Sequence, residues 1–200
     1  RHTRCLSDWS SDVCSSDLGE YTWLARALDL GARGVMIPMV ESAQHAQTIV
    51  QACRYPPLGR RGAAFGFAQC DYQGGDIGKK MVAYHDRTVV IAKIETEKGL
   101  AAAESIAAVD GIDVLWVGHF DLSNFMGIPG QFEHPDFLAA MKRVADVARQ
   151  HGKVAGFMAT DAAWADKVMA MGYTMIATGT DTGMLQQGFA NLIQHIDQRG

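Results

Sequence analysis

The sequence predicts an α/β fold, and within that class a (β/α)8 TIM barrel. From residue 19 onward, short apolar segments alternate with amphipathic ones, which is the order of repeated strand–helix units. The apolar segments are nearly continuous in apolar residues, as in parallel strands that are buried on both faces. No G-x-G-x-x-G motif follows any of them, which argues against the open sheet of dinucleotide-binding proteins and favours the barrel.

Five strands are predicted, with helices between them. The expected strands cover residues 34–38, 88–94, 112–117, 154–158 and 174–178. A further short strand is predicted at residues 61–64. Apolar residues at helical spacing predict helices over residues 43–53, 99–109, 137–148 and 185–196. Ser42, Asp161 and Asp181 are expected N-caps, and Gly172 stands where a helix should end.

Residues 1–18 do not fit this pattern. The segment RHTRCLSDWSSDVCSSDL is rich in Ser, Asp and Cys and has neither helical nor strand periodicity. It resembles the translation of sequencing-adapter read-through. We therefore expect a non-native or disordered segment over residues 1–18 and a partial barrel domain over residues 19–200.

Composition and charge exclude several classes of protein. The 200 residues, 48% hydrophobic and 20% charged, suit one globular domain with a sizeable core. A net charge of −4 without a basic stripe argues against a nucleic-acid partner, and no apolar run is long enough to span a membrane. The four cysteines lack the spacing of metal ligands, so a reduced, cytoplasmic protein is expected.

Two acidic residues follow neighbouring predicted strands. Glu95 ends the run VVIAKIE, and Asp121 comes four residues after Val117 in WVGHFDLS. Functional groups of a parallel barrel lie at the C-terminal ends of its strands, so the two carboxylates should converge over the barrel mouth. Carboxylate-only ligation favours a hard cation such as Mg²⁺ or Mn²⁺, and a 2-oxo acid can chelate at the open positions. The alternative from spacing alone is that Glu95 is a surface loop residue and Asp121 a helix N-cap.

Five segments, in this order, resemble the HpcH/HpaI aldolase family. They are GARGVMIPMVESA, RYPPLGRRG, IAKIETEKGL, VDGIDVLWVGHFDLSNFMGIPG and ATGTDTGML, and the match runs from about Leu24 to the C-terminus. The resemblance implies a metal-dependent class II aldolase of the pyruvate/phosphoenolpyruvate barrel superfamily, related to the citrate lyase β subunit. It also implies a homo-oligomer, typically a hexamer, for the full-length protein.

The resemblance assigns roles to particular residues. Glu95 in the I-E-T motif and Asp121 in the G-x-x-D-L-S motif correspond to the family's metal ligands, for Mg²⁺ or Mn²⁺ with Co²⁺ also compatible. The backbone N–H groups of Phe120 and Asp121 correspond to those that hold the substrate carboxylate. Lys93 replaces a common Gln and should face the same site as Glu95, because residues two apart on a strand point the same way. We expect Lys93 to stay protonated and to bind substrate oxygens or pair with Glu97, with a Schiff base as the competing mechanism.

Other positions depart from the family pattern. His119 and Phe120 replace the commoner Pro-Ala pair. His119 is a candidate acid–base residue, with packing against a neighbour as the alternative, and Phe120 should narrow the pocket. Gln69 stands where many members have Arg near the distal end of the substrate.

The family's first two strands, which carry an acidic-histidine motif and an arginine, have no counterpart in this chain. The expected fold is therefore an incomplete barrel with its first two strands missing. The expected function is cleavage of a 4-hydroxy-2-oxo acid to pyruvate and an aldehyde through a metal-stabilised enolate, impaired in this fragment. The alternatives are a citrate- or citramalyl-thioester lyase and a catalytically inactive fragment that binds a metal or an oxo acid.

Overall fold

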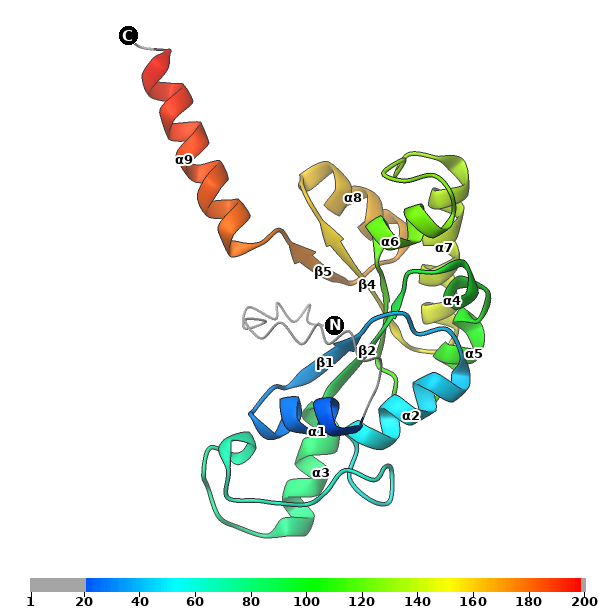
Figure 1. The fold of residues 1–200 in the computed structure, drawn as a ribbon, viewed down its shortest axis with the longest axis vertical. Helices are drawn as coiled ribbons and strands as arrows, with labels where there is room; N and C mark the ends of the chain where they lie inside the picture. The colour runs from blue at the N-terminus through cyan, green and yellow to red at the C-terminus, as the bar shows by residue number, and fades with distance from the viewer. Residues whose placement is uncertain (1–20, 199–200) are drawn as a thin grey trace.

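The computed structural model describes residues 21–198, and a curved sheet of five parallel strands forms its centre (Figure 1). The strands pair in chain order, and each is parallel to its neighbours. They are β1 (Gly34–Ile37), β2 (Val89–Ile94), β3 (Val114–Val117), β4 (Val154–Ala159) and β5 (Met175–Thr178). The five predicted strands and the incomplete barrel are thereby confirmed. The segment over residues 1–18 lies outside the described residues.

Helices lie between and after the strands, and several of them cover the outer face of the sheet (Figure 1). They are α1 (Tyr21–Asp29), α2 (Ala43–Cys53), the short 3-10 helix η1 (Ala68–Cys70), α3 (Ile77–Arg87), α4 (Glu97–Ala101), α5 (Ala103–Ala107), α6 (His119–Phe125), α7 (Pro135–Gln150), α8 (Ala162–Met171) and α9 (Asp181–Asp197). None of the helices within residues 21–198 has the length and apolarity needed to cross a membrane.

Local sequence signals place most of the helix ends. The side chains of Ser42 and Asp161 accept hydrogen bonds from backbone N–H groups of α2 and α8, as predicted. Gly172 ends α8 in the left-handed conformation, with φ +108°. The prediction for Asp181 is wrong: Thr180 is the N-cap of α9, and Asp181 is its first residue.

Two other predictions about the elements are corrected. The expected helix over residues 99–109 is two short helices, α4 and α5, joined at Ala102, whose ψ of 0° departs from helical geometry. The expected strand at residues 61–64 is an unpaired stretch of the loop between α2 and α3.

The sheet buries apolar side chains on both of its faces. The larger cluster lies between the outer face and the helices, with α7 packed against β3 and β4. A second cluster on the inner face contains Ile91, Val114 and Trp116. Gly156 makes room for the indole of Trp116, because a Cβ at this position would lie 2.4 Å from the ring. Burial on both faces explains why the strands read as continuous apolar runs.

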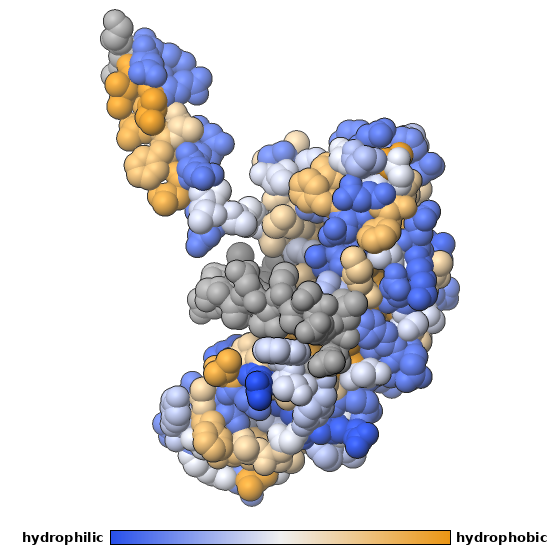
Figure 2. Space-filling model, in the orientation of Figure 1, coloured by the Kyte–Doolittle hydropathy of each residue, from blue (hydrophilic) through white to orange (hydrophobic). Residues whose placement is uncertain are grey.

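Helix α9 differs from the others because it projects away from the sheet and its helices (Figure 1). All of its residues are exposed. Its apolar stripe consists of Met184, Leu185, Phe189, Leu192, Ile193 and Ile196. Figure 2 shows apolar side chains gathered along one side of this helix and polar ones along the other.

Candidate active site at the C-terminal ends of the strands

Glu95 directly follows β2 and is almost completely buried, with 2% of its surface exposed. Its Oε1 accepts a hydrogen bond from the backbone N–H of Met39 at 2.8 Å. Its Oε2 is buried and makes no hydrogen bond within the described residues. The Lys93 ammonium lies 2.9 Å from Oε2, at ion-pair distance but outside hydrogen-bond geometry. The alternative that Glu95 is a surface loop residue is therefore wrong.

Gly118 provides the space that the Glu95 carboxylate occupies. It follows β3, and its N–H donates to the carbonyl of Ile94 at 3.1 Å, which continues the pairing of β2 with β3. A Cβ on Gly118 would lie 2.3 Å from Oε2 of Glu95. Any larger residue at this position would displace the carboxylate.

Lys93 lies on β2 opposite Trp116 and faces the same site as Glu95, as predicted. The predicted pairing with Glu97 is wrong. Lys93 pairs with Glu95 instead, because both side chains leave the same face of the strand, whereas Glu97 is exposed at the start of α4.

Asp121 is the third residue of α6 and is partly exposed. The N-cap of this helix is Gly118, so the alternative in which Asp121 is only an N-cap is wrong. The first backbone bond of the helix runs from the N–H of Leu122 to the carbonyl of Gly118, at 2.8 Å. The N–H groups of Phe120 and Asp121 precede it and have no helical partner. The Asp121 carboxylate makes no hydrogen bond or ion pair with another residue of the described 21–198 range.

The two carboxylates fit a hard divalent cation by their chemistry. They follow adjacent strands, and a buried oxygen of Glu95 and the whole carboxylate of Asp121 lack hydrogen-bond partners within the part of the chain described. Carboxylate oxygens are the ligands that Mg²⁺ and Mn²⁺ prefer. Residues 21–198 contain no cluster of three or more His, Cys, Asp or Glu side chains suited to a metal. A cation held here would complete its coordination with water or substrate oxygens.

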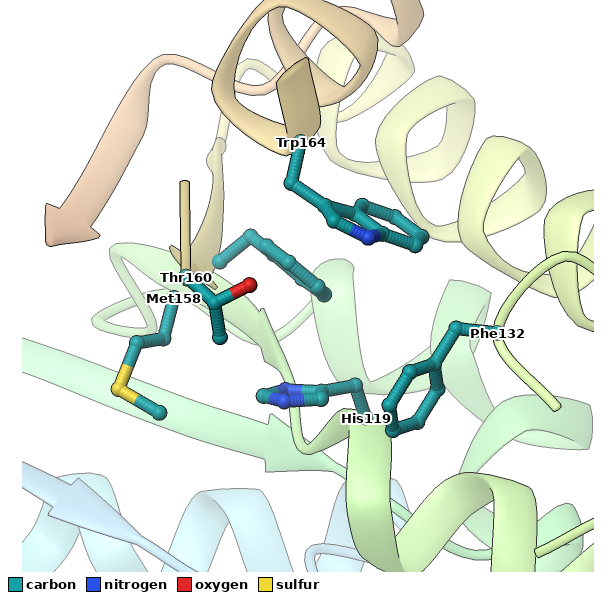
Figure 3. A pocket seen from close by; sticks show the side chains of 6 residues that line it. His119, Phe132, Met158, Thr160 and Trp164 are labelled. Carbon is teal, nitrogen blue, oxygen red and sulfur yellow. The ribbon is translucent and has the colours of Figure 1, made fainter. Parts of the chain in front are cut away.

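His119 begins α6, two residues before Asp121, and lines a small hollow (Figure 3). The other lining residues are Phe132, Phe157, Met158, Thr160 and Trp164. The imidazole contacts Phe157 and Phe132 with ring centroids 5.0 and 5.2 Å away, and its ring nitrogens have no hydrogen-bond partner among the described residues. The hollow is shallow: the space that a water-sized group can reach is about 20 Å³, close to the size of one such group.

The surroundings of His119 favour its neutral form. Burial lowers the pKa of His119 below its usual value, and the positive charge of Lys93 lowers it further, while the Asp121 carboxylate opposes both. A neutral imidazole can accept a proton, so the position suits an acid–base residue. The alternative, packing against neighbours, is also observed in the aromatic contacts, and the two roles are compatible.

Phe120 and Gln69 have different surroundings. Phe120 is 57% exposed and packs edge-on against Phe132, at a centroid distance of 5.2 Å. Gln69 is buried, and its amide donates to the carbonyl of Ala64 in its own loop. The Tyr84 hydroxyl in α3 donates to the backbone carbonyl of Gln69 at 2.8 Å. These contacts fix the loop between α2 and α3.

Sequence reasoning did not identify two features of the site. Met39 donates to Glu95 from a left-handed backbone conformation with φ +48°, and no residue type in this stretch indicates such a conformation. The aromatic residues around His119 come from β4, α8 and the loop before α7, so no single periodic pattern contains them.

Parallel strands in chain order, outer helices and paired carboxylates at the strand ends define a (β/α)-barrel protein with an acidic candidate active site. A sequence profile described as HpcH/HpaI aldolase/citrate lyase matches residues 15–187, a range that begins before the start expected at about Leu24. The chain belongs to the HpcH/HpaI aldolase/citrate lyase family.

Relatives with assigned activities include two aldolases. The chain is 36% identical over 169 residues to a 2-keto-3-deoxy-L-rhamnonate aldolase of Klebsiella pneumoniae, covering 84% of this chain and 63% of that protein. It is 36% identical over 183 residues to a hydroxypyruvate/pyruvate aldolase of Roseobacter denitrificans, covering 88% of this chain and 68% of that protein. The chain thus spans about two thirds of the length of these curated relatives.

A solved structure shows the same architecture. The crystal structure of an HpcH/HpaI aldolase from Desulfitobacterium hafniense superposes with a TM-score of 0.83 at 34% identity, covering 88% of this chain and 68% of that chain. The five strands and their helices are therefore part of a TIM barrel of this family.

Proposed function

We propose that the protein, at the full length of its relatives, is a class II aldolase that cleaves a 4-hydroxy-2-oxo acid to pyruvate and an aldehyde. The observation that carries the proposal is the buried Glu95 carboxylate, which has one oxygen free of hydrogen bonds. Glu95 follows β2, and the neighbouring strand β3 leads to Asp121. The two aldolases at 36% identity support the reaction class.

Glu95 and Asp121 would hold the divalent cation, Mg²⁺ or Mn²⁺. When bound, the cation supplies a Lewis acid that polarises the keto group of the substrate. The N–H groups of Phe120 and Asp121 bind the substrate carboxylate, and the Lys93 ammonium donates to a substrate oxygen. These contacts orient the C3–C4 bond of the substrate for cleavage.

His119 is the residue we assign to the proton transfer within this part of the barrel. Its neutral imidazole accepts the proton of the C4 hydroxyl, the C3–C4 bond breaks, and C4 becomes the carbonyl carbon of the aldehyde. The electron pair of the broken bond passes into the C2–C3 unit, which becomes pyruvate after C3 takes up a proton.

Metal binding and turnover are tested separately. Calorimetric titration with Mn²⁺ should give saturable binding in the wild type and none in Glu95→Ala or Asp121→Ala. Pyruvate release from a panel of 4-hydroxy-2-oxo acids, with the protein at the length of its relatives, tests the reaction. Turnover that survives in both carboxylate variants would rule out the proposed site.

A Schiff base on Lys93 is the competing mechanism. The Lys93 side chain is engaged with the Glu95 carboxylate at 2.9 Å, rather than free to attack a keto group. Lys93→Gln should therefore retain measurable metal-dependent activity. Abolished activity in this variant, together with borohydride trapping of the wild type by pyruvate, would establish the Schiff base instead.

Two alternatives stay within the same family. A citrate- or citramalyl-thioester lyase would release acetyl thioester only from a thioester substrate, so it would give no pyruvate with the free 4-hydroxy-2-oxo acids of the same assay. A catalytically inactive fragment would bind Mn²⁺ or oxo acids without releasing pyruvate.

The proposal includes self-association and a cytoplasmic location. The exposed apolar stripe of α9 is a surface that a second copy of the chain would cover, which supports a homo-oligomer. The small-molecule substrates are an oxo acid and an aldehyde. The cytoplasmic location rests on the absence of a disulfide-like cysteine pattern, and Cys53 and Cys70 are both free.

A further inference from the structure

Residues 39–41, here termed the strap, connect β1 to α2 across the C-terminal end of β2. Each strap residue contacts that end of the sheet. The N–H of Met39 donates to Glu95 Oε1 at 2.8 Å, and the N–H of Val40 donates to the carbonyl of Lys93 at 3.2 Å. The Glu41 carboxylate accepts a hydrogen bond from the Thr96 hydroxyl at 2.9 Å. The strap thus contacts Glu95 and the residues on either side of it.

Met39 has a backbone conformation that its residue type disfavours. Its φ of +48° lies in the left-handed region, which a non-glycine residue adopts only where the surroundings impose it. Val40, the next residue, is fully buried in the main core and fixes the strap on that side. The strained residue is the one that donates to Glu95, so the strain lies at the candidate metal ligand.

Glu41, at the other end of the strap, binds the turn that follows Glu95. The Thr96 hydroxyl that donates to Glu41 also accepts from the N–H of Gly99 at 3.0 Å and so caps α4. Lys98 pairs with the same carboxylate at 3.2 Å. A Cβ on Gly99 would lie 2.8 Å from the carbonyl oxygen of Val40, so only glycine lets α4 approach the strap this closely.

We propose that Met39 and Glu41 are positioning residues that fix the Glu95 carboxylate in the orientation required to bind the divalent cation. The inference rests on the proposed metal site. The Met39 amide holds Oε1, which leaves Oε2 beside Gly118 and the Lys93 ammonium, without a hydrogen bond within the described residues. Neighbours that hydrogen-bond a metal ligand in this way set its orientation and contribute to metal affinity.

The first test compares two substitutions of Met39. Valine is β-branched and disfavours a left-handed φ, whereas glycine adopts it without strain. Met39→Val should weaken Mn²⁺ binding in calorimetric titration by roughly 10- to 100-fold, and Met39→Gly should bind close to wild type. A packing role alone predicts the reverse order, because glycine removes more of the side chain than valine does.

The second test uses Glu41 and serves equally if Met39→Val does not fold. Glu41→Ala removes the acceptor for Thr96, while Glu41→Gln keeps an oxygen that can accept from the hydroxyl. Glu41→Ala should weaken Mn²⁺ binding by roughly tenfold, and Glu41→Gln should restore most of it. Thermal unfolding without metal, measured in parallel, separates lost affinity from lost structure.

The hydrogen bond between Met39 and Glu95 can be tested without metal, and Mn²⁺ binding then separates the positioning role from the metal site itself. The amide resonance of Met39 in a ¹⁵N-labelled wild-type chain should shift in Glu95→Ala, because the hydrogen bond to Oε1 is lost. Mn²⁺ binding that depends on Glu95 but is equal in Met39→Val, Met39→Gly and wild type would overturn the positioning role and leave the proposed function standing. Wild-type binding that does not depend on Glu95 would overturn both.

Discussion

Replacing Gly118 with alanine should remove the metal site while leaving every candidate ligand in the sequence. The new Cβ would lie 2.3 Å from Oε2 of Glu95, 2.8 Å from its Cβ and 3.0 Å from Cε of Lys93. The backbone of Gly118 cannot move away freely, because its N–H is bonded to the carbonyl of Ile94 at 3.1 Å. The Glu95 side chain must therefore move, and its hydrogen bond from Met39 is lost.

The Gly118→Ala substitution lowers the free energy of unfolding in two ways. Overpacking a buried position costs about 1–3 kcal/mol, and loss of a hydrogen bond to a charged group costs about 1.5–3 kcal/mol. Together they lower the free energy of unfolding by roughly 2–5 kcal/mol, since the two effects overlap. For a protein of this size each kcal/mol shifts Tm by about 2–4 °C, so Tm should fall by roughly 5–20 °C.

The assay is calorimetric unfolding with and without Mn²⁺, followed by Mn²⁺ titration of the folded protein. Gly74→Ala is the matched control, because no heavy atom lies within 4 Å of a Cβ at that position and its φ is not in the left-handed region. Wild-type Tm and wild-type Mn²⁺ affinity in Gly118→Ala would refute the close packing of Gly118 against Glu95 and the argument built on it.

Three further predictions concern other parts of the molecule. Asp113→Ala leaves the buried Arg54 without its carboxylate partner at 2.8 Å and should cost about 2–3 kcal/mol in urea unfolding, with Asp113→Asn costing less. His85 accepts a hydrogen bond from the N–H of Tyr55 at 3.1 Å, and its pKa is lowered mainly by burial and further by the positive charge of Arg54. The free energy of unfolding should therefore be highest above pH 6.5 and should fall as the pH drops from 6.5 toward the pKa of His85 in the folded protein. The wild type should self-associate through α9 in sedimentation velocity, and Phe189→Asp should shift it toward the monomer.

Each of these predictions has its own contrary outcome. Equal free energies of unfolding for wild type and Asp113→Ala would mean that the hydrogen bonds from Arg54 to backbone carbonyls are enough to compensate its buried charge. His85→Gln keeps a neutral acceptor, so it should flatten the dependence of stability on pH between 8 and 5; an unchanged slope would assign that dependence to another group. A wild type that stays monomeric at every concentration measured would contradict the role given to the stripe containing Phe189.

The fold and the two carboxylates could be predicted from sequence because each depends on a local rule. Continuous apolar runs specify strands that are buried on both faces, and the barrel architecture places the residues after them at one end. These two rules make Glu95 and Asp121 candidates at neighbouring strand ends, and the resemblance to the family favours them as metal ligands over the surface-loop and N-cap alternatives. Thr180 and Asp181 are adjacent residues that both suit an N-cap, so sequence could not decide between them.

The rest of the site depends on contacts between segments far apart in the chain. The partner of Lys93 was predicted wrongly because Glu97 is near in sequence but belongs to a helix that turns it outward. The aromatic environment of His119 combines residues from 132 to 164, and only the packing of β4 and α8 brings them together. The left-handed φ of Met39 is imposed by tertiary structure, so residue type gives no signal of it.

Helix α9 is joined to the rest of the described chain through Gly179 and Thr180, after β5. Every residue of this 17-residue helix is exposed in the described part of the chain, so its stability depends on whatever covers it. The end of the chain should therefore open as a separate cooperative unit, well before the five-stranded sheet does. Brief protease treatment of dilute protein should cut first near Gly179, and the same treatment of concentrated protein should leave that bond protected.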